Sequence, residues 1–92
     1  MAAGHIMDYS KLPEHIQQGF RDYIEYGVPM GDFGTAVLEN DLMEAFMRAD
    51  ETNIARMFDI VSFVYNEAPS ACHGSREKVK SWLAHDWSKE VE

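Results

Sequence analysis

The spacing of the apolar residues is the feature that most constrains how this chain can fold. Apolar residues recur every three or four positions in several segments, and glycine, proline, asparagine or aspartate separates one segment from the next. This spacing gathers apolar side chains on one face of an α-helix, whereas a half-buried strand would alternate apolar and polar residues. Because no segment shows sustained alternation, the sequence predicts an all-α fold, a compact bundle of four to five short helices.

The first predicted helix begins near Pro13 and ends at Gly27. Proline suits the first turn of a helix, where an N–H would have no partner, and Ser10 is a candidate N-cap just upstream. Gly27 can adopt the left-handed conformation that commonly ends a helix. The apolar face between these ends consists of Leu12, Ile16, Phe20, Tyr23 and Ile24.

Two longer helices are predicted in the middle of the chain. One runs from about residue 32 to residue 49, with a kink or split near Asn40, because Gly34 and the Asn40-Asp41 pair weaken its helical preference. The next begins at Asp50 as its N-cap and ends before Pro69. Its apolar residues cover more than one stripe, which predicts a central helix packed on several sides. They are Ile54, Met57, Phe58, Ile60, Val61, Phe63, Val64 and Tyr65.

The last predicted helix has Ser75 as its N-cap and carries Val79, Trp82 and Leu83, with Trp87 near its end. Residues 8–87 are therefore expected to form a single helical domain. The first seven residues, MAAGHIM, are typical of vector-derived sequence before a second methionine, and residues 88–92 are typical of a frayed polar tail.

Cysteine content and hydropathy indicate the compartment. No apolar stretch approaches the roughly 18 residues of a membrane span, and the N-terminal residues do not resemble a signal peptide. The lone cysteine cannot form an internal disulfide. The expected localisation is the cytoplasm, without membrane association.

The net charge of −8 restricts the partners. From Arg21 to Asp59 there are nine acidic and three basic residues, and such a surface is repelled by phosphate backbones and by anionic membranes. Direct binding to nucleic acid is therefore not expected. The acidity has two open interpretations: it keeps the protein soluble, or carboxylates such as Asp41, Glu44 and Glu51 imitate phosphates at a partner's surface.

The Cys72-His73 pair is the most reactive-looking dipeptide. Adjacent side chains point apart, so they make a poor nucleophile and base, and Cys72 is predicted to pack under its loop. His85 and Asp86 complete no standard zinc spacing with this pair. The sequence also lacks nucleotide-binding glycine motifs. We therefore predict no catalytic residues, no metal and no cofactor, and an enzyme is not expected.

Eleven aromatic residues exceed what one small core is expected to hide, so some should be exposed as anchors for a partner. Trp87 near the end of the last helix is the first candidate and Trp82 the second. The remaining candidates are Phe20, Tyr23, Tyr26 and Phe33.

Four runs, YIEYGVPMGDF, TAVLENDLMEAFMRAD, FDIVSFVYNEAPSACHGS and VKSWL, resemble an uncharacterised family of small phage- and prophage-encoded proteins of proteobacteria. The resemblance covers about residues 12–83 and implies the cytoplasm of a host cell, but it supplies no reaction and no catalytic residues. The chain departs from the family at three positions. Met30 replaces a second proline, Gly34 replaces a larger apolar residue, and His73 replaces an aromatic residue such as tryptophan. The last departure makes His73 a candidate contact position.

We therefore expect a small acidic phage or prophage accessory protein that binds a host or phage protein. Its expected action is to modulate or inhibit a host protein, with anti-CRISPR or anti-restriction inhibition as specific variants. A self-associating structural or assembly protein, such as a homodimer, is one alternative, and a small thiol- or metal-dependent enzyme built on Cys72 is another. The candidate partner-binding residues are Asp41, Glu44, Glu51, His73, Trp82 and Trp87.

Overall fold

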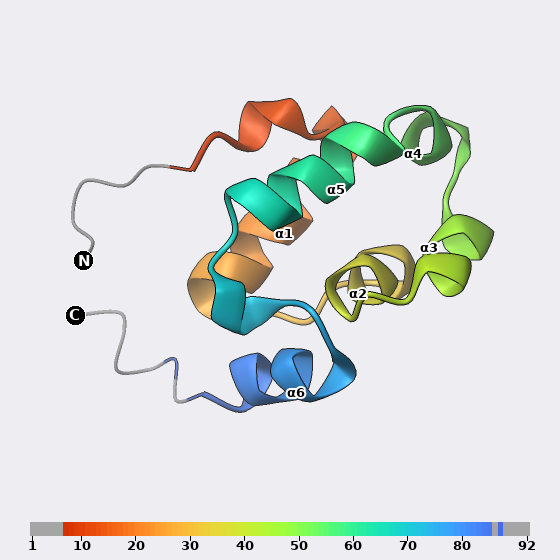
Figure 1. The fold of residues 1–92 in the computed structure, drawn as a ribbon. Coiled ribbons are helices and arrows are strands. Elements are labelled where there is room, and N and C mark those ends of the chain that lie inside the picture. The colour runs from red at the N-terminus through yellow and green to blue at the C-terminus, as the bar shows by residue number, and fades with distance from the viewer. Residues whose placement is uncertain (1–6, 86, 88–92) are drawn as a thin grey trace.

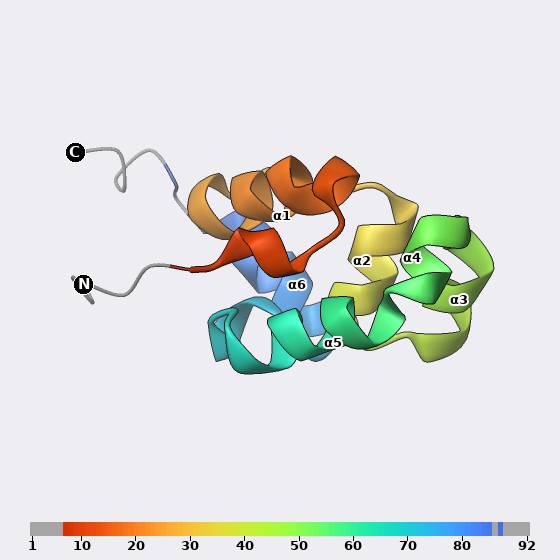
Figure 2. The ribbon, with the colours of Figure 1, turned by 90° about the horizontal axis from the view of Figure 1, so that it is seen from above.

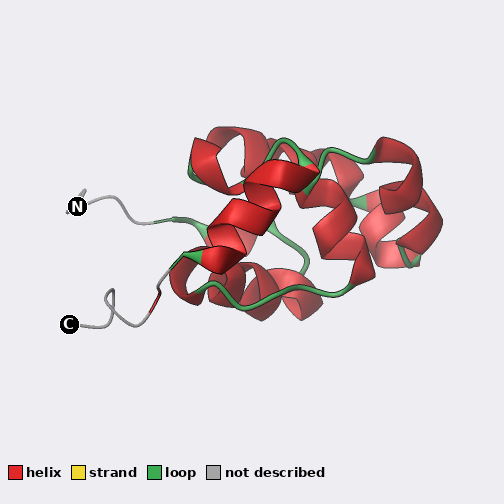
Figure 3. Cartoon of the chain, turned by 90° about the horizontal axis from the view of Figure 1, so that it is seen from below, coloured by secondary structure: helices red, strands yellow, loops and turns green. Residues whose placement is uncertain are grey.

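The computed structural model describes residues 7–85 and residue 87, and helices make up most of this part of the chain (Figure 1). The six α-helices there are α1 (Glu14–Tyr26), α2 (Asp32–Leu38), α3 (Leu42–Arg48), α4 (Glu51–Ala55), α5 (Met57–Asn66) and α6 (Arg76–Ala84). Two single-turn 3-10 helices, η1 (Tyr9–Lys11) and η2 (Ser70–Cys72), lie in the connections. Within the described residues there is no strand, so the all-α prediction is confirmed (Figure 3).

The core forms where α1, α5 and η1 meet. Phe20 of α1 and Phe63 of α5 are both almost fully buried, and their rings meet edge to face with centroids 6.0 Å apart. Tyr9 of η1 packs against the same Phe63 ring, with centroids 5.5 Å apart. Such pairs add to the stability that the burial itself provides. Figures 1 and 2 place α2, α3 and α4 at the end of the molecule away from the two described ends of the chain.

Helix α1 ends as its sequence predicts. Gly27 adopts the left-handed conformation with φ of 68°. Its N–H donates to the carbonyl of Tyr23 at 3.0 Å, and the N–H of Val28 donates to the carbonyl of Asp22 at 3.2 Å. Both bonds satisfy carbonyl groups that the helix end would leave unpaired.

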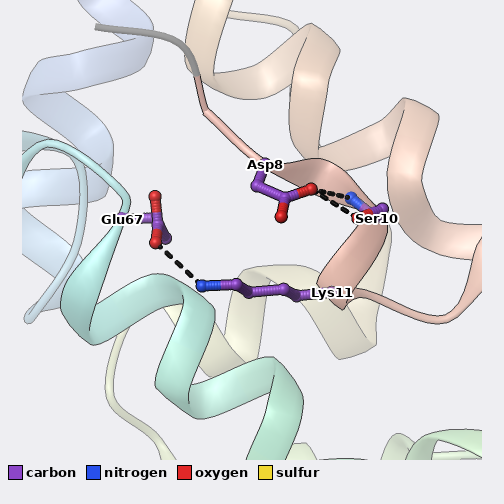
Figure 4. A network of polar contacts seen from close by, with 4 residues as sticks. All are labelled: Asp8, Ser10, Lys11 and Glu67. Atoms are coloured by element: carbon purple, nitrogen blue, oxygen red, sulfur yellow. Dashed lines mark hydrogen bonds and ion pairs between the residues drawn. The ribbon is translucent and has the colours of Figure 1, made fainter.

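The start of α1 differs from the prediction. Pro13 is the N-cap residue, but Ser10 does not cap this helix. Ser10 instead lies in η1, where its N–H donates to Asp8 Oδ1 at 3.1 Å (Figure 4). Lys11 of η1 forms a 3.1 Å ion pair with Glu67 after α5, which ties the N-terminal turn to the core.

The predicted helix over residues 32–49 is split, as expected, at Asn40. This residue has φ of 64°, and the N–H of Asp41 reaches back to the carbonyl of Ala36 at 2.9 Å. Asp41 then caps α3, because its Oδ1 accepts from the N–H of Glu44 at 3.2 Å. One three-residue turn therefore ends α2 and begins α3.

Asp50 is the N-cap of α4, as predicted. Its Oδ1 accepts from the N–H of Asn53 at 2.8 Å, and this bond, with a smaller effect from His15, holds the pKa of the Asp50 carboxyl below its usual value. The prediction of one unbroken helix after Asp50 is wrong, because the chain breaks at Arg56 between α4 and α5. At this break the Arg56 guanidinium donates to the carbonyl of Lys11 at 2.9 Å and to Asp59 Oδ2 at 2.6 Å. Five of the six described α-helices have at least seven residues, as expected, and the sixth, the five-residue α4, results from the break at Arg56.

Ser75 is the N-cap of α6, also as predicted, and its Oγ accepts from the N–H of Lys78 at 3.1 Å. The helix ends at Ala84, so Trp87 lies beyond it. Met7 packs against the core. The other residues assigned to vector sequence, 1–6, and the predicted polar tail, 88–92, lie outside the described residues.

The sequence predicts a central helix packed on several sides, but α5 leaves one face exposed. Helix α5 buries Ile60 and Phe63 but leaves Phe58 81% exposed and Tyr65 79% exposed. Val61, between them on the same face, is 45% exposed. Two apolar stripes therefore run along α5, and no other described helix covers the second one.

Candidate functional site

An apolar groove of about 400 Å³ lies between α5 on one side and α2 and α3 on the other. Its most buried lining residues are Ala36 of α2 and Ala45 of α3, each 3% exposed, together with Val64 and Met57 of α5 at 5% and 8%. Larger apolar side chains, among them Val37, Leu42 and Val61, form its sides. A concave, apolar, partly open surface of this size is the default candidate for a binding site.

The α5 side of the groove is part of the exposed stripe. Phe58, Val61 and Tyr65 are spaced by three and four residues, so they lie on one face of the helix. Val61 and Tyr65 line the groove directly. Single exposed apolar residues are normal on a soluble protein, but a continuous stripe beside a groove marks an interaction surface.

The α3 side is equally apolar. Ala45 is the only residue that α3 buries. Leu42, which lines the groove, is 65% exposed, and Phe46, one turn further along the same face, is 42% exposed. Met43 and Met47 are each 79% exposed on the adjoining face. Methionine side chains adapt to irregular surfaces and are frequent where proteins bind varied partners.

His73 lines the groove from the loop between α5 and α6. The N–H of Gly74 donates to the carbonyl of Leu38 at 2.7 Å, which fixes this loop to the end of α2. The His73 Nε2 atom is buried without a hydrogen-bond partner in the described part of the chain. Burial, and to a smaller extent Lys78, lowers the pKa of His73, so its ring is neutral at pH 7. His73 thus brings a buried, unpaired nitrogen atom to the wall of the groove.

The three predicted acidic contact residues lie at different distances from this groove. Asp41 lines it directly. Glu44 is on α3 and forms a 2.6 Å ion pair with Arg48, while Glu51 is exposed in the first turn of α4. Asp41 and His73 are thus the two predicted residues that the structure brings to one site.

Trp82 and Trp87 lie elsewhere and pack on each other, with ring centroids 5.0 Å apart. Trp82 Nε1 donates to the carbonyl of Tyr23 at 2.9 Å, and Trp87 Nε1 donates to the carbonyl of Trp82 at 2.8 Å. The hollow that they line, of about 330 Å³, shares no lining residue with the groove. Their polar N–H groups are used inside the molecule, and the structure does not bring these residues to the apolar groove.

The other proposed aromatic anchors are distributed differently from the prediction. Phe20 and Tyr23 are almost fully buried in the core, Phe33 is partly buried against it, and Tyr26 is 56% exposed. The strongly exposed aromatic side chains beside the groove, Phe58 and Tyr65, were assigned to the core instead.

One sequence signal could have identified this stripe. Ile54, Phe58, Val61 and Tyr65 follow one another at intervals of four, three and four residues. That sequence of intervals repeats every seven residues, as in helices that pack lengthwise against a partner helix. The buried stripe of Met57, Ile60 and Phe63 is complete without these residues.

Cys72 is fully buried, and the prediction that it packs under its loop is confirmed. Burial raises the pKa of its thiol to about 12, which favours the protonated and weakly nucleophilic form. Among the residues that the structure describes, no three His, Cys, Asp or Glu side chains come together to hold a metal ion. Asp86, one of the ligands considered from the sequence, lies outside this part of the chain.

None of the described helices has the length and apolar character needed to cross a membrane. Comparison of the chain with protein-family models, with curated proteins and with solved structures finds no match.

Proposed function

We propose that this protein acts by binding another protein through the apolar groove between α5 and the α2–α3 pair. The observation that carries the proposal is the exposed stripe of Phe58, Val61 and Tyr65 beside a groove of about 400 Å³. Removing apolar surface from water contributes about 25 cal/mol per Å², and large aromatic side chains dominate many interfaces. A partner that covered this stripe would remove its apolar surface from water, and this burial would favour binding.

The resemblance to phage and prophage proteins supports a host or phage protein as the partner, met in the cytoplasm of the host cell. Modulation or inhibition of that partner is the simplest action for a small binding protein, and we include anti-CRISPR and anti-restriction inhibition as variants. Those variants depend on charge. If they hold, neutralising Asp41, Glu44 and Glu51 together will weaken partner binding and reduce its salt dependence.

Site-specific photo-cross-linking in a proteobacterial host tests the binding proposal. A photoreactive amino acid is placed at Val61, which lines the groove and is 45% exposed, or at Val28, which is 46% exposed and lies in the loop after α1. Val28 is the matched control, because it is also a valine and its side chain is almost equally exposed. We expect a defined adduct from position 61 and none from position 28. Equal adducts, or none from position 61, would contradict the proposal.

Self-association is a second candidate, because a second copy could also cover the exposed stripe. The net charge of −8 on each copy opposes it, since two such chains repel each other. Sedimentation at micromolar concentration separates the two functions. A monomer excludes the homodimer, and a dimer that the Val61→Asp substitution dissociates would establish it.

A further inference from the structure

We infer that the groove takes an amphipathic α-helix of the partner protein, with apolar side chains on one face and lysine or arginine beside them. This inference rests on the proposed function, because it names the shape and charge of the partner at the same groove. It follows from the architecture of the groove and from the charge of the helices around it.

The architecture of the groove favours a helix over an extended peptide. Within the described residues there is no strand, so the molecule offers no sheet edge to which a peptide strand could hydrogen-bond. Two sides of the groove are the helices α3 and α5, and the small residues Ala36 and Ala45 are among its most buried lining residues. Small residues at a base let another helix approach closely, and its apolar side chains then fill the space between the two sides.

The exposed side chains extend beyond the groove and set the length of the occupant. From Phe58 to Tyr65 the stripe spans two helical turns, about 10 Å along α5. Phe46 continues the apolar surface on α3 one turn away from Leu42. A small molecule confined to the groove would leave Phe58 and Phe46 uncovered. A helix of about 14 residues, about 21 Å long, would span the stripe with about one turn to spare at each end.

The helices that form the groove carry a net negative charge, which favours a partner helix with basic residues. Between Asp32 and Asn66 there are seven acidic and two basic residues, a net charge of −5. Ion pairs engage some of these carboxylates, but the Asp41 carboxylate at the groove has no cationic partner among the described residues and accepts a hydrogen bond only from the N–H of Glu44. A second copy of this acidic chain would be repelled, whereas flanking lysine or arginine residues would be attracted.

Titration with model peptides tests this inference. The probe is a helix-stapled peptide of about 14 residues with leucine along one face and lysine elsewhere. One companion replaces every lysine with glutamate, and a second keeps the composition but removes the helical spacing. Binding to the full chain is measured by fluorescence anisotropy at low and at moderate salt, and backbone NMR shifts report where the peptide lies.

We expect the lysine peptide to bind at the groove, with the largest shifts at Leu42, Val61 and Tyr65, and to bind more weakly as salt increases. Val61→Asp should weaken binding by about tenfold or more, whereas Val28→Asp should leave it unchanged. The glutamate peptide and the peptide without helical spacing should each bind at least about tenfold more weakly.

Three results would overturn the inference: equal binding of the lysine and glutamate peptides, equal binding of the peptide without helical spacing, or equal loss in the Val61→Asp and Val28→Asp variants. Cross-linking keeps the two proposals distinguishable. If position 61 gives a defined adduct but the lysine peptide does not bind, the inference of a basic helix is wrong and the proposed protein binding at the groove still stands. Absence of that adduct would contradict the proposed function itself.

Discussion

The side chain of Met30 lies against Gly34 and occupies the space that a larger side chain at position 34 would need. A Cβ atom at position 34 would lie 2.8 Å from Met30 Sδ, a distance that nonbonded atoms do not tolerate. Met30 Cε would also lie 3.3 Å from a Cβ at Gly19 of α1. Met30 and Gly34 are therefore one packing feature, in which the methionine fills the volume that the glycine leaves.

Substitutions at Met30 and Gly34 should have strongly coupled effects on the free energy of unfolding. Gly34→Leu alone should lower the free energy of unfolding by about 1–3 kcal/mol, because the leucine collides with Met30. Met30→Pro with Gly34→Leu should recover most of that loss, since the proline vacates the space. Urea unfolding of the two single variants and the double variant measures the coupling. Additive effects would show that the two positions are independent.

Gly27→Ala should destabilise the protein by about 1–2 kcal/mol. Its φ of 68° is costly for a residue with a Cβ, and that atom would also collide with the indole of Trp87. Thermal unfolding measures the loss, and tryptophan fluorescence should report the displaced indole. Gly31→Ser is the control, because this glycine has ordinary φ, no neighbour within 4 Å and an N-cap position that serine favours. Equal losses in both variants would contradict this account.

Two phenylalanines of α5 should differ sharply in their importance for folding. Phe63→Ala should cost about 3–5 kcal/mol of unfolding free energy, because this side chain is 1% exposed in the core. Phe58→Ala should change the unfolding free energy by less than about 0.5 kcal/mol, because its side chain is 81% exposed. Chemical denaturation compares the two. A large loss for Phe58→Ala would mean that the second stripe belongs to the core after all.

Cys72 should resist thiol reagents in the folded protein and react fully in denaturant. Its folded-state pKa of about 12 lies above the ordinary value of 9.0. The protonated thiol therefore contributes stability that is fully present below about pH 9 and is lost as the pH rises towards 12. Burial also raises the pKa of Tyr9 and Tyr23, so their ionisation adds to this alkaline loss.

Labelling at pH 8 with and without urea, and unfolding curves across the alkaline range, check this prediction. Complete labelling of the native protein at the rate seen in urea would contradict the buried position of Cys72. Unfolding free energies that stay constant above pH 9 would contradict the raised pKa values.

Local chemistry explains which parts of the fold could be predicted from the sequence. The ends of helices at Gly27, Asn40, Asp50 and Ser75 depend on the backbone preferences and short-range hydrogen bonds of those residues. At the break, Arg56 donates a hydrogen bond to the carbonyl of Lys11, 45 residues away, and no local pattern predicts this contact.

The site could be predicted only in part for a related reason. Asp41 is predicted from its acidic side chain and His73 from a family resemblance, and both line the groove. The spacing of Phe58, Val61 and Tyr65 shows that they share a helix face, but it does not show whether another helix covers that face. Whether another helix covers that face of α5 depends on the path of the chain in three dimensions, which includes the turn at Asn40 and the end of the short α3.

The hydrogen bond from the N–H of Gly74 to the carbonyl of Leu38 has a consequence for how fast a partner can bind. It joins the His73 loop to the end of α2, so this side of the groove is a single preformed body rather than two segments that must first meet. A partner then needs little rearrangement of the backbone here before it docks. Diffusion and the attraction between opposite charges should therefore govern its association rate.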